Sequence, residues 1–279
     1  MDNIVSIIIV QYKSEDDVIA CIASIKKAKT TYQQEIIVVD NNPTQHNQRV
    51  LKQKFPDVSY IKNKKNNGFG AGNNIGATYA HGKYLFFLNP DTLVFPQTVN
   101  ILINFLKKNM KTGVVAPLLL TKDKKVFPLQ GSLTLTPLRA VAALSFIYKY
   151  FPNNPIAKSY FLTNWNKESI QYVDVVPGTA CIIRREVFEQ VGGFDESFFL
   201  YFEESDLCKR IKEKGFFLSI IPQAKIIHIS GQSTKYLSNI KDIFIKSRFH
   251  YFRKHYGYLQ AVFVEAFCRF SLSTLLHLK

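Results

Sequence analysis

The sequence predicts an α/β fold built on a parallel β-sheet. In the N-terminal third, apolar runs rich in β-branched residues alternate with helical patterns, as in successive βαβ units. The runs expected to form buried strands are Val5–Val10, Glu35–Val39, Val58–Ile61 and Tyr84–Leu88. Asp40 follows the second run directly, and Asp91 lies just beyond the last one. Because ligands of such sheets bind beyond the carboxyl ends of the strands, both carboxylates are candidates for a site.

Helices are expected between these strands. Ser14 and the acidic residues that follow it are typical of a helix start, and apolar residues then repeat at helical spacing. A second helix is expected near Gln45–Lys54, and a third runs from the glycine-rich loop Asn66–Asn74 to about Ala80. Each helix can therefore serve as a crossover between two parallel strands.

The rest of the chain is less regular but continues the mixture. Further strands are expected at Gly113–Ala116, Val173–Val176, Phe217–Ile221 and Lys225–Ile229. Further helices are expected at Pro96–Lys108, Arg185–Val191, Glu203–Lys214, Ser238–His255 and Tyr258–Leu276. Gly215 directly follows the third of these helices, as a glycine that ends a helix commonly does.

Composition describes a globular enzyme-sized chain. Its 279 residues are 47% hydrophobic and 20% charged, which excludes a disordered protein. The four cysteines form no CxxC or other metal-ligand pattern, so we expect reduced thiols and a cytosolic location. No signal peptide is visible, and no apolar run reaches the roughly 18–20 residues of a transmembrane helix.

Positive charge is concentrated near the C-terminus. The net charge is +15, and the residues after Leu207 hold 13 Lys and Arg against 3 Asp and Glu. The last expected helix also has one apolar stripe bordered by basic residues; the stripe is Leu259, Val262, Phe263, Ala266, Phe267 and Phe270. Both packing against the domain and binding to a membrane interface fit this pattern. In the second case, removal of the segment after Tyr256 would release the protein from membranes.

Three features in the N-terminal part fit the binding of a nucleotide and a cation. Asp91 in the Asn-Pro-Asp sequence can bind Mg²⁺ or Mn²⁺, although this sequence is also a common turn. The loop Asn66–Asn74 lets backbone approach a diphosphate closely, and the helix after it favours negative charge. Asp40 can contact a nucleoside or simply form an Asx-turn.

Acidic residues interspersed with aromatic ones mark the segment from Gly193 to Leu207. An apolar surround raises the pKa of a carboxyl group and suits it to general-base work. The alternative is that acids at a helix start cap its positive end. His228 follows an expected strand and is either a metal ligand or, more commonly for a lone histidine, a hydrogen-bonded structural residue.

The order of these motifs resembles that of family 2 inverting glycosyltransferases of the GT-A fold, in particular rhamnosyltransferase-like bacterial members. The resemblance runs from about Ile4 to about Tyr256. It implies a Rossmann-like nucleotide-binding sheet with a smaller acceptor-binding part, plus C-terminal helices. The implied organisation is a GT-A domain over residues 1–235, with a nucleotide-sugar half of about 1–115 and an acceptor half of about 116–235. A basic amphipathic helical segment, 236–279, follows.

The resemblance also implies roles for single residues. Glu204 matches the catalytic base, and Asp91 matches the metal-binding acid, with His228 completing the metal shell. Asn89 stands where the family motif has its first Asp, which removes one negative charge from the metal site. The residues implied to bind substrate are Asp40, Asn67, Gly68, Gly72, Asn73, Asn89, Gly178, Thr179, Ala180, Glu203 and Asp206.

The implied reaction is a single in-line displacement with inversion. Glu204 accepts the proton of an acceptor hydroxyl as its oxygen attacks the anomeric carbon, and a Mg²⁺ or Mn²⁺ ion offsets charge on the departing diphosphate. The implied donor is dTDP-rhamnose or a UDP-sugar, and the acceptor is a saccharide or lipid-linked saccharide of a cell-surface polysaccharide. The expected location is the cytoplasm, on the inner face of the cell membrane. No nucleic-acid partner is expected, and a homodimer is left open.

Two other functions compete with this one. A nucleotidyltransferase that makes nucleotide sugars usually has a basic glycine-rich loop after its first strand, whereas this chain has Gln11-Tyr12-Lys13-Ser14 there. A basic protein that binds nucleic acid needs a basic groove with stacking aromatics. Here the aromatics near Glu203 alternate with acids, which have the wrong sign for phosphate.

Overall fold

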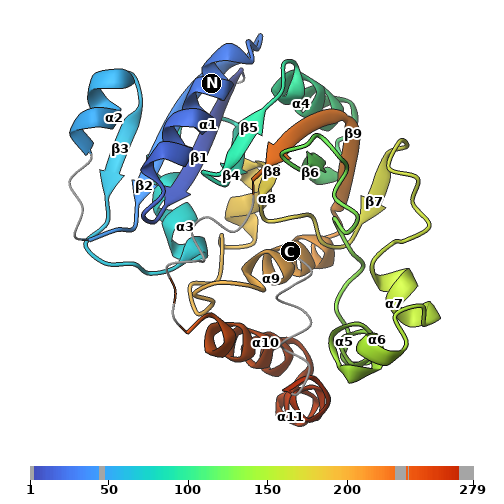
Figure 1. Cartoon of the computed structure of the whole chain (residues 1–279). Helices are drawn as coiled ribbons and strands as arrows, with labels where there is room; N and C mark the ends of the chain where they lie inside the picture. Colours follow the sequence, from blue (N-terminus) through green and yellow to red (C-terminus); the bar gives the residue numbers. More distant parts are fainter. Residues whose placement is uncertain (1–2, 44–47, 230–236, 238, 270–279) are drawn as a thin grey trace.

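A nine-stranded sheet forms the centre of the computed structural model, which describes residues 3–43, 48–229, 237 and 239–269 (Figure 1). Its strands are β1 (Ile4–Gln11), β2 (Gln33–Asp40), β3 (Ser59–Lys62), β4 (Tyr84–Leu88), β5 (Thr92–Val94), β6 (Thr112–Leu120), β7 (Gln171–Val173), β8 (Ala180–Arg184) and β9 (Phe217–His228). Neighbouring strands follow the order β3-β2-β1-β4-β8-β6-β9-β5, and β7 pairs with β9.

The N-terminal half of the sheet is parallel, as the sequence predicts. Strand β1 pairs in parallel with β2 and β4, and β2 pairs in parallel with β3. The crossovers contain α1 (Glu15–Lys27), α2 (Gln48–Lys54) and α3 (Phe69–Tyr79). As a result, Asp40 and Asn89 lie at the same carboxyl edge of the sheet.

The other half is mixed, and it differs from the sequence-based expectations in two places: one strand was not predicted, and two predicted strands are one. Ala180–Arg184 is a strand, β8, that runs antiparallel to both β4 and β6. The two strands expected at Phe217–Ile221 and Lys225–Ile229 are one strand, β9. Its register against β6 jumps at Pro117 and Leu118, so the intervening residues of β9 bulge out of the ladder. Pro222 lies in that bulge of β9, and it interrupts the apolar run without ending the strand.

The five helices predicted in this part of the chain lie close to their expected positions. They are α4 (Thr98–Lys108), α8 (Arg185–Gln190), α9 (Glu203–Glu213), α10 (Ile240–Tyr256) and α11 (Tyr258–Cys268). The predicted end of the last helix, near Leu276, lies outside the described residues. Three short helices were not expected, because segments of five to eight residues are too short to show a helical repeat: α5 (Pro137–Leu144), α6 (Phe146–Tyr150) and α7 (Pro155–Tyr160).

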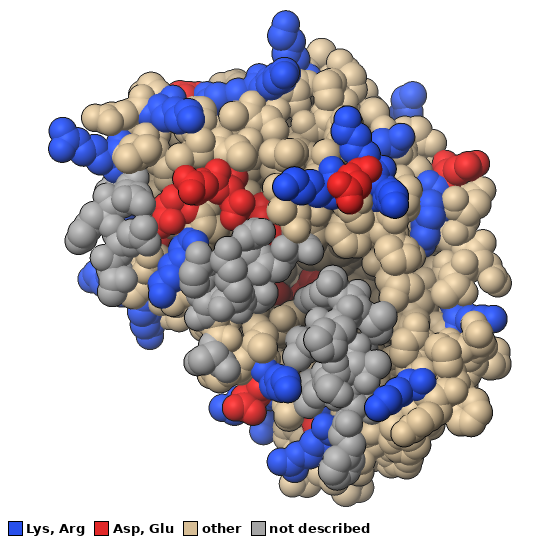
Figure 2. All heavy atoms as spheres, in the orientation of Figure 1, with Lys and Arg blue, Asp and Glu red and all other residues tan. Residues whose placement is uncertain are grey.

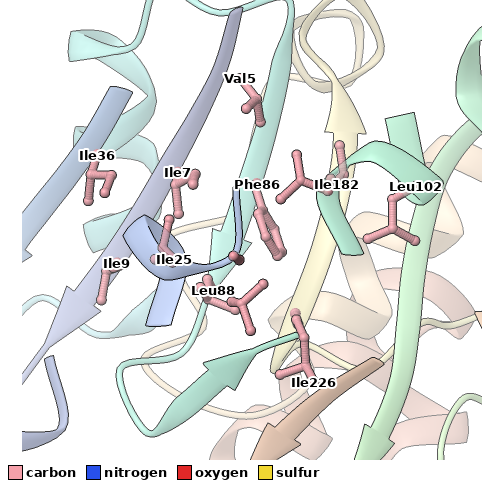
Figure 3. Packing of buried hydrophobic residues seen from close by; sticks show 14 of the residues in the cluster. Val5, Ile7, Ile9, Ile25, Ile36, Phe86, Leu88, Leu102, Ile182 and Ile226 are labelled. Atoms are coloured by element: carbon pink, nitrogen blue, oxygen red, sulfur yellow. The ribbon is translucent and has the colours of Figure 1, made fainter. Parts of the chain in front are cut away.

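Both faces of the central strands are buried, which explains their uninterrupted apolar sequences. Alternate residues of β1 belong to different cores: Ile7 and Ile9 pack on one face, and Ile8 on the other. Helices α1 and α4 cover the first face through side chains such as Ile25 and Leu102, which surround Phe86 of β4 in Figure 3. Helices α8 and α9 cover the second face.

A third core joins the C-terminal helices to the rest of the chain. Tyr251 and Phe252 of α10 and Ala261 and Val264 of α11 are fully buried against α5 and the segment before α9. Arg248 and Glu265 tie α10 to α11 through two hydrogen bonds of 2.6 and 2.9 Å. The C-terminal helices therefore pack on the domain. Within the described ranges, no helix is both long and apolar enough to cross a bilayer.

The predicted apolar stripe of the last helix is not its packed face. Leu259, Val262 and Phe263 are 81%, 43% and 47% exposed. The buried side chains of α11 are instead Ala261, Val264 and Cys268, and Phe270 lies outside the described residues. Of the predicted stripe, Phe267 is half-buried and stacks on Phe146, whereas Leu259, Val262 and Phe263 lie on the surface.

Candidate active site

The first part of the site surrounds Asp40, the last residue of β2. Its side chain is buried, and its carboxylate accepts hydrogen bonds from Gln11, Tyr60 and Lys62, the last at 3.0 Å. The backbone amide of Asn42 also donates to it at 2.9 Å, so the Asx-turn, which was the alternative interpretation of Asp40, is present. Burial and the Asp40 carboxylate raise the pKa of Tyr60 well above its usual range, which keeps its phenol a hydrogen-bond donor. Asp40 thus organises a polar cluster at the carboxyl edge of the sheet.

The glycine-rich loop is held against the segment that precedes α9. Gly68 has φ +94°, and a Cβ atom there would lie 2.1 Å from the carbonyl oxygen of Phe199. The next residue, Phe69, donates its backbone N–H to that same oxygen at 2.9 Å. Asn41 donates to the carbonyl of Gly68 at 2.9 Å. Only glycine allows the loop to come this close to another backbone.

The remaining residues of this loop differ in exposure. Asn67 is half-buried, whereas Gly72 and Asn73 are buried in α3. A Cβ atom on Gly72 would lie 2.7 Å from Val10, and the Asn73 amide donates to the carbonyl of Phe69 at 3.1 Å. In this structure Gly72 and Asn73 shape the start of α3 from inside, and Asn67 is the one of the three that faces partly outward.

The antiparallel pairing of β4 and β8 brings the two halves of the chain together. Leu88 pairs with Ala180, and the amide of Asn89 donates to the carbonyl of Thr179 at 2.8 Å. The side-chain oxygen of Asn89 is buried and accepts no hydrogen bond from the described residues. A Cβ atom on Gly178 would lie 3.4 Å from Cβ and Cγ of Glu204. Residues predicted for donor and acceptor binding thus form one continuous wall.

Asp91 and His228 lie close together where β5 pairs with β9, at the end of the strand order. Strand β5 follows Asp91 and pairs Thr92 with His228 of β9, and the amide of Ile229 donates to the Asp91 carbonyl at 2.9 Å. Nε2 of His228 lies 3.5 Å from Oδ1 of Asp91, and both side chains are largely buried. The sequence predicted this pair as metal ligands, and the structure does bring the two side chains together.

Glu203 and Glu204 begin α9 after a strained turn. Tyr201 and Phe202 both have left-handed backbone angles, with φ of 69° and 68°. Such conformations cost on the order of 1–3 kcal/mol per non-glycine residue and cluster at functional sites. Glu203 is buried and packs near Gly70. A Cβ atom added to Gly70 would lie 3.7 Å from the Cβ of Glu203. Glu204 is half-buried and more open than its neighbour.

The charge of Glu204 acts on two buried side chains that the sequence did not single out. Burial and the Glu204 carboxylate raise the pKa of Tyr160, at the end of α7, to about 12. The same two causes raise the pKa of Cys181, in β8, to about 12. Neither residue carries a sequence signal, because only the fold brings α7 and β8 to Glu204.

Asp206 does not share the open site with Glu204. Its side chain is fully buried and contacts Arg210 at 2.8 Å, Lys254 at 2.6 Å and His255 at 2.8 Å. Burial alone would raise the pKa of Asp206, but hydrogen bonds from His255 and Lys254 outweigh burial and lower it. The expectation of raised carboxyl pKa values is wrong for this residue and for Asp195, whose pKa is lowered by Lys254 and Ser197 despite burial.

Acidic side chains gather on this side of the molecule. Figure 2 shows them along and inside a recess in the face viewed, with Lys and Arg side chains spread around its periphery. The site thus contains two kinds of acidic group. Glu204 is a half-buried carboxylate beside the backbone of Gly178, and Asp91 is a buried carboxylate paired with His228. The first can accept a proton, and the second can bind a cation.

Known proteins are similar to this chain in sequence and in fold. The model of the family described as Glycosyl transferase family 2 matches residues 6–192. The chain is 24% identical over 247 residues to the N-acetylglucosaminyl-diphospho-decaprenol L-rhamnosyltransferase of Mycobacterium tuberculosis, which covers 84% of this chain and 78% of that one. It is 28% identical over 258 residues to Rhamnosyltransferase WbbL of Escherichia coli, covering 88% of this chain and 92% of that one.

A solved structure with the same fold is that of GalNAc-T7 with UDP, GalNAc and Mn²⁺. It superposes with a TM-score of 0.64 at 17% sequence identity, over 89% of this chain and 47% of that one. This likeness concerns the fold alone, and it confirms the predicted GT-A architecture.

Replacing Gly68 with alanine is expected to destabilise the protein more than the same change at Gly192. Both glycines have positive φ, but a Cβ on Gly192 meets nothing within 4 Å. Gly192→Ala should therefore cost about 1 kcal/mol through backbone strain alone, whereas Gly68→Ala should cost roughly 2–4 kcal/mol because it also displaces the Phe199 backbone. Urea denaturation of both variants measures the difference. Equal losses would show that the close approach of Gly68 to Phe199 is not a constraint.

Proposed function

The chain belongs to glycosyl transferase family 2 and is an inverting glycosyltransferase of the rhamnosyltransferase-like type; from this premise we propose its substrates and the roles of its residues. The proposed reaction transfers rhamnose or another hexose from a nucleoside-diphosphate sugar to a saccharide or lipid-linked saccharide of a cell-surface polysaccharide. The observation that carries this proposal is the wall in which Asn89, Thr179 and Gly178 lead directly to Glu204.

Glu204 is the proposed catalytic base. Its half-buried carboxylate accepts the proton of the acceptor hydroxyl, whose oxygen forms a bond to the anomeric carbon. The bond between that carbon and the diphosphate oxygen breaks at the same time, and the nucleoside diphosphate leaves with the bonding electrons. Gly178 has no side chain, and we propose that the acceptor uses the space beside Glu204 that a Cβ atom would otherwise occupy.

Asp91 and His228 are the proposed ligands of a divalent cation. No group of three His, Cys, Asp or Glu side chains suited to a metal occurs among the described residues, so the protein offers this pair. The pair fits Mg²⁺ or Mn²⁺, hard cations that commonly take one or two protein ligands and complete their shell with diphosphate oxygens and water. Asn89, two residues before Asp91, has a buried side-chain oxygen that accepts no hydrogen bond from the described residues. This oxygen can accept a hydrogen bond from the substrate or from a water molecule. Once bound, the cation offsets negative charge on the leaving diphosphate.

The donor proposed first is dTDP-rhamnose, with UDP-hexoses as the second choice. The names of the relatives support rhamnose, because two of them are rhamnosyltransferases. Asp40 and its ring of donors from β1 and β3 form the proposed base and ribose pocket. Asn67 and Gly68 are proposed to contact the nucleotide and the donor sugar.

The acceptor side is proposed to meet a membrane surface. The relative from Mycobacterium tuberculosis is named for a decaprenol-linked substrate. In this chain, Leu259, Val262 and Phe263 expose large apolar side chains on one side of α11, and Arg253 and Arg269 near them are exposed. An apolar stripe with basic borders is typical of helices that lie in a membrane interface and bind anionic lipids. The proposed location is therefore the cytoplasmic face of the cell membrane.

Turnover should require Glu204 but not Glu213, an exposed acid at the other end of α9. With dTDP-rhamnose or UDP-hexoses, Mn²⁺ or Mg²⁺ and a short-chain N-acetylglucosaminyl diphosphoprenol, the wild type should release nucleoside diphosphate and form the inverted glycoside. Glu204→Gln should lower kcat by roughly 10²–10⁴-fold and leave the Kd of the nucleoside diphosphate unchanged. Glu213→Gln, which changes an exposed acid of the same helix, is the control.

Failure takes two distinct forms in this experiment. If no donor gives nucleoside diphosphate and the protein instead binds RNA or DNA in a salt-sensitive manner, the proposed reaction is wrong. If donor binding falls in parallel with kcat, Glu204 is a binding residue and not the base.

Metal-dependent donor binding should require Asp91. Calorimetry with dTDP or UDP should show tighter binding to the wild type in the presence of Mn²⁺, and EDTA should remove the gain. Asp91→Ala should lose about tenfold or more of the affinity measured with Mn²⁺ and keep the affinity measured in EDTA, because only the cation-mediated contact is removed. Asp123→Ala, in an exposed turn, serves as the control. Equal Mn²⁺ dependence in both variants would contradict the assignment.

Membrane binding should depend on the exposed stripe of α11. The full chain should sediment with vesicles containing phosphatidylglycerol and dissociate partly at high salt. The double variant Leu259→Glu with Phe263→Glu should reduce vesicle binding at least about tenfold, since two apolar side chains can no longer insert. Val50→Glu, which changes an exposed residue of α2, should bind like the wild type. Unchanged binding of the double variant would contradict the proposal.

A further inference from the structure

The turn that leads into α9 has an unusual backbone. Tyr201 and Phe202 are the only adjacent non-glycine residues with left-handed φ in the part of the chain that the structure describes. Glu204 follows two residues later on the first turn of the helix. A strained conformation of this kind persists only where its surroundings hold it in place. The direction of the Glu204 side chain therefore depends on what holds this turn.

Helix α10 contacts the turn from the side opposite the sheet, as the neighbouring positions of α9 and α10 in Figure 1 indicate. The hydroxyl of Ser247 donates to the carbonyl of Leu200 at 2.8 Å, directly before the strained pair. The ring of Tyr251 lies 5.8 Å from that of Phe202, between ring centroids. Both residues of α10 are buried. Helix α10 thus covers the turn with one hydrogen bond and one ring contact.

Two cationic or polar side chains of α10 bind the start of α9 itself. Nζ of Lys254 lies 2.6 Å from Oδ1 of Asp206 and 2.7 Å from Oδ2 of Asp195, so it joins the two ends of the segment that contains the turn. Nε2 of His255 lies 2.8 Å from Oδ1 of Asp206. Asp206 is fully buried and His255 nearly so, whereas the Lys254 side chain is 29% exposed, so the contact between Asp206 and His255 is the better shielded from water.

Asp206 transmits these contacts to Glu204. The two residues occupy the same first helical turn, and the amide of Asp206 donates to the carbonyl of Phe202 at 2.9 Å. Any tilt of α9 that breaks the Asp206 contacts would therefore also move Glu204 relative to Gly178. The same ion pairs offset part of the negative charge that Asp195, Glu203 and Asp206 place around Glu204.

We propose that α10 is a positioning element for catalysis, in which Lys254 and His255 act through Asp206, and Ser247 acts through Leu200, to orient Glu204. These are positioning residues, since none of them is placed in contact with substrate. The inference rests on the proposed role of Glu204 as the base. It assigns to the C-terminal segment a part in the reaction, beyond any contact of that segment with a membrane.

The test separates kcat from donor binding in the full-length chain. Lys254→Met and Ser247→Ala should each lower kcat with dTDP-rhamnose by about 10- to 100-fold, because a displacement of the base by about 1 Å costs that much. The Kd for dTDP with Mn²⁺ should change less than twofold in both. Lys254→Arg keeps the charge and should restore most of kcat. Lys246→Met, which changes an exposed lysine of the same helix, should leave kcat unchanged.

Thermal unfolding of each variant completes the test. Ser247→Ala removes one hydroxyl and is the variant that keeps the test valid if Lys254→Met fails to fold. Unchanged kcat in a folded variant would overturn the inference, as would a parallel fall of kcat and dTDP affinity. The parent proposal is tested separately: a fully active Glu204→Gln variant would refute Glu204 as the base, whereas an inactive one beside an unaffected Lys254→Met would refute only the role of α10.

Discussion

The pairing of β4 with β8 is the constraint on which the site depends. It is fully buried, and every residue of both strands lies within the sheet core. A backbone hydrogen bond lost in such a place would leave unpaired polar groups without water, so the register of Leu88 against Ala180 is fixed. That register sets Asn89 beside Thr179 and, one residue further, Gly178 beside Glu204. Two parts of the chain that are distant in sequence thereby share one rigid edge.

The sequence predicted the parallel half of the sheet well, because each of its strands is buried on both faces and is therefore apolar throughout. It failed where other features hid the strands. The segment Ala180–Arg184 is a strand of only five residues, and no strand was predicted for it from the sequence. The proline of β9 suggested a break, but it lies in a bulge where no ladder hydrogen bond is required.

The predicted site residues fall into three groups for physical reasons. Asp91 and His228 meet because β5 and β9 pair, and residues around Asp40 meet because Gln11, Asp40 and Lys62 are in register across three strands. Register is not readable from one sequence, so these partners of Asp40 were not predicted.

Asp206 illustrates the third group. It is two residues from Glu204, and side chains two apart on a helix point in different directions. Closeness in sequence therefore suggested a shared site, whereas the helix turns Asp206 away toward α10. The same geometry makes Asp206 useful, because it anchors the helix from behind while Glu204 remains on the side of Gly178.

The C-terminal helices connect the exposed stripe of α11 to the start of α9. Arg248 and Glu265 form a buried pair with two hydrogen bonds, which fixes α11 on α10. Helix α10 in turn binds the start of α9 through Asp206. The exposed stripe of α11 therefore has a fixed orientation relative to Glu204. A lipid-linked acceptor approaching from a membrane bound to that stripe, as proposed, would meet the proposed base in a defined geometry, which a flexibly tethered anchor could not provide. This is a physical reason for such an enzyme to pack its basic, amphipathic end against the catalytic helix instead of leaving it free.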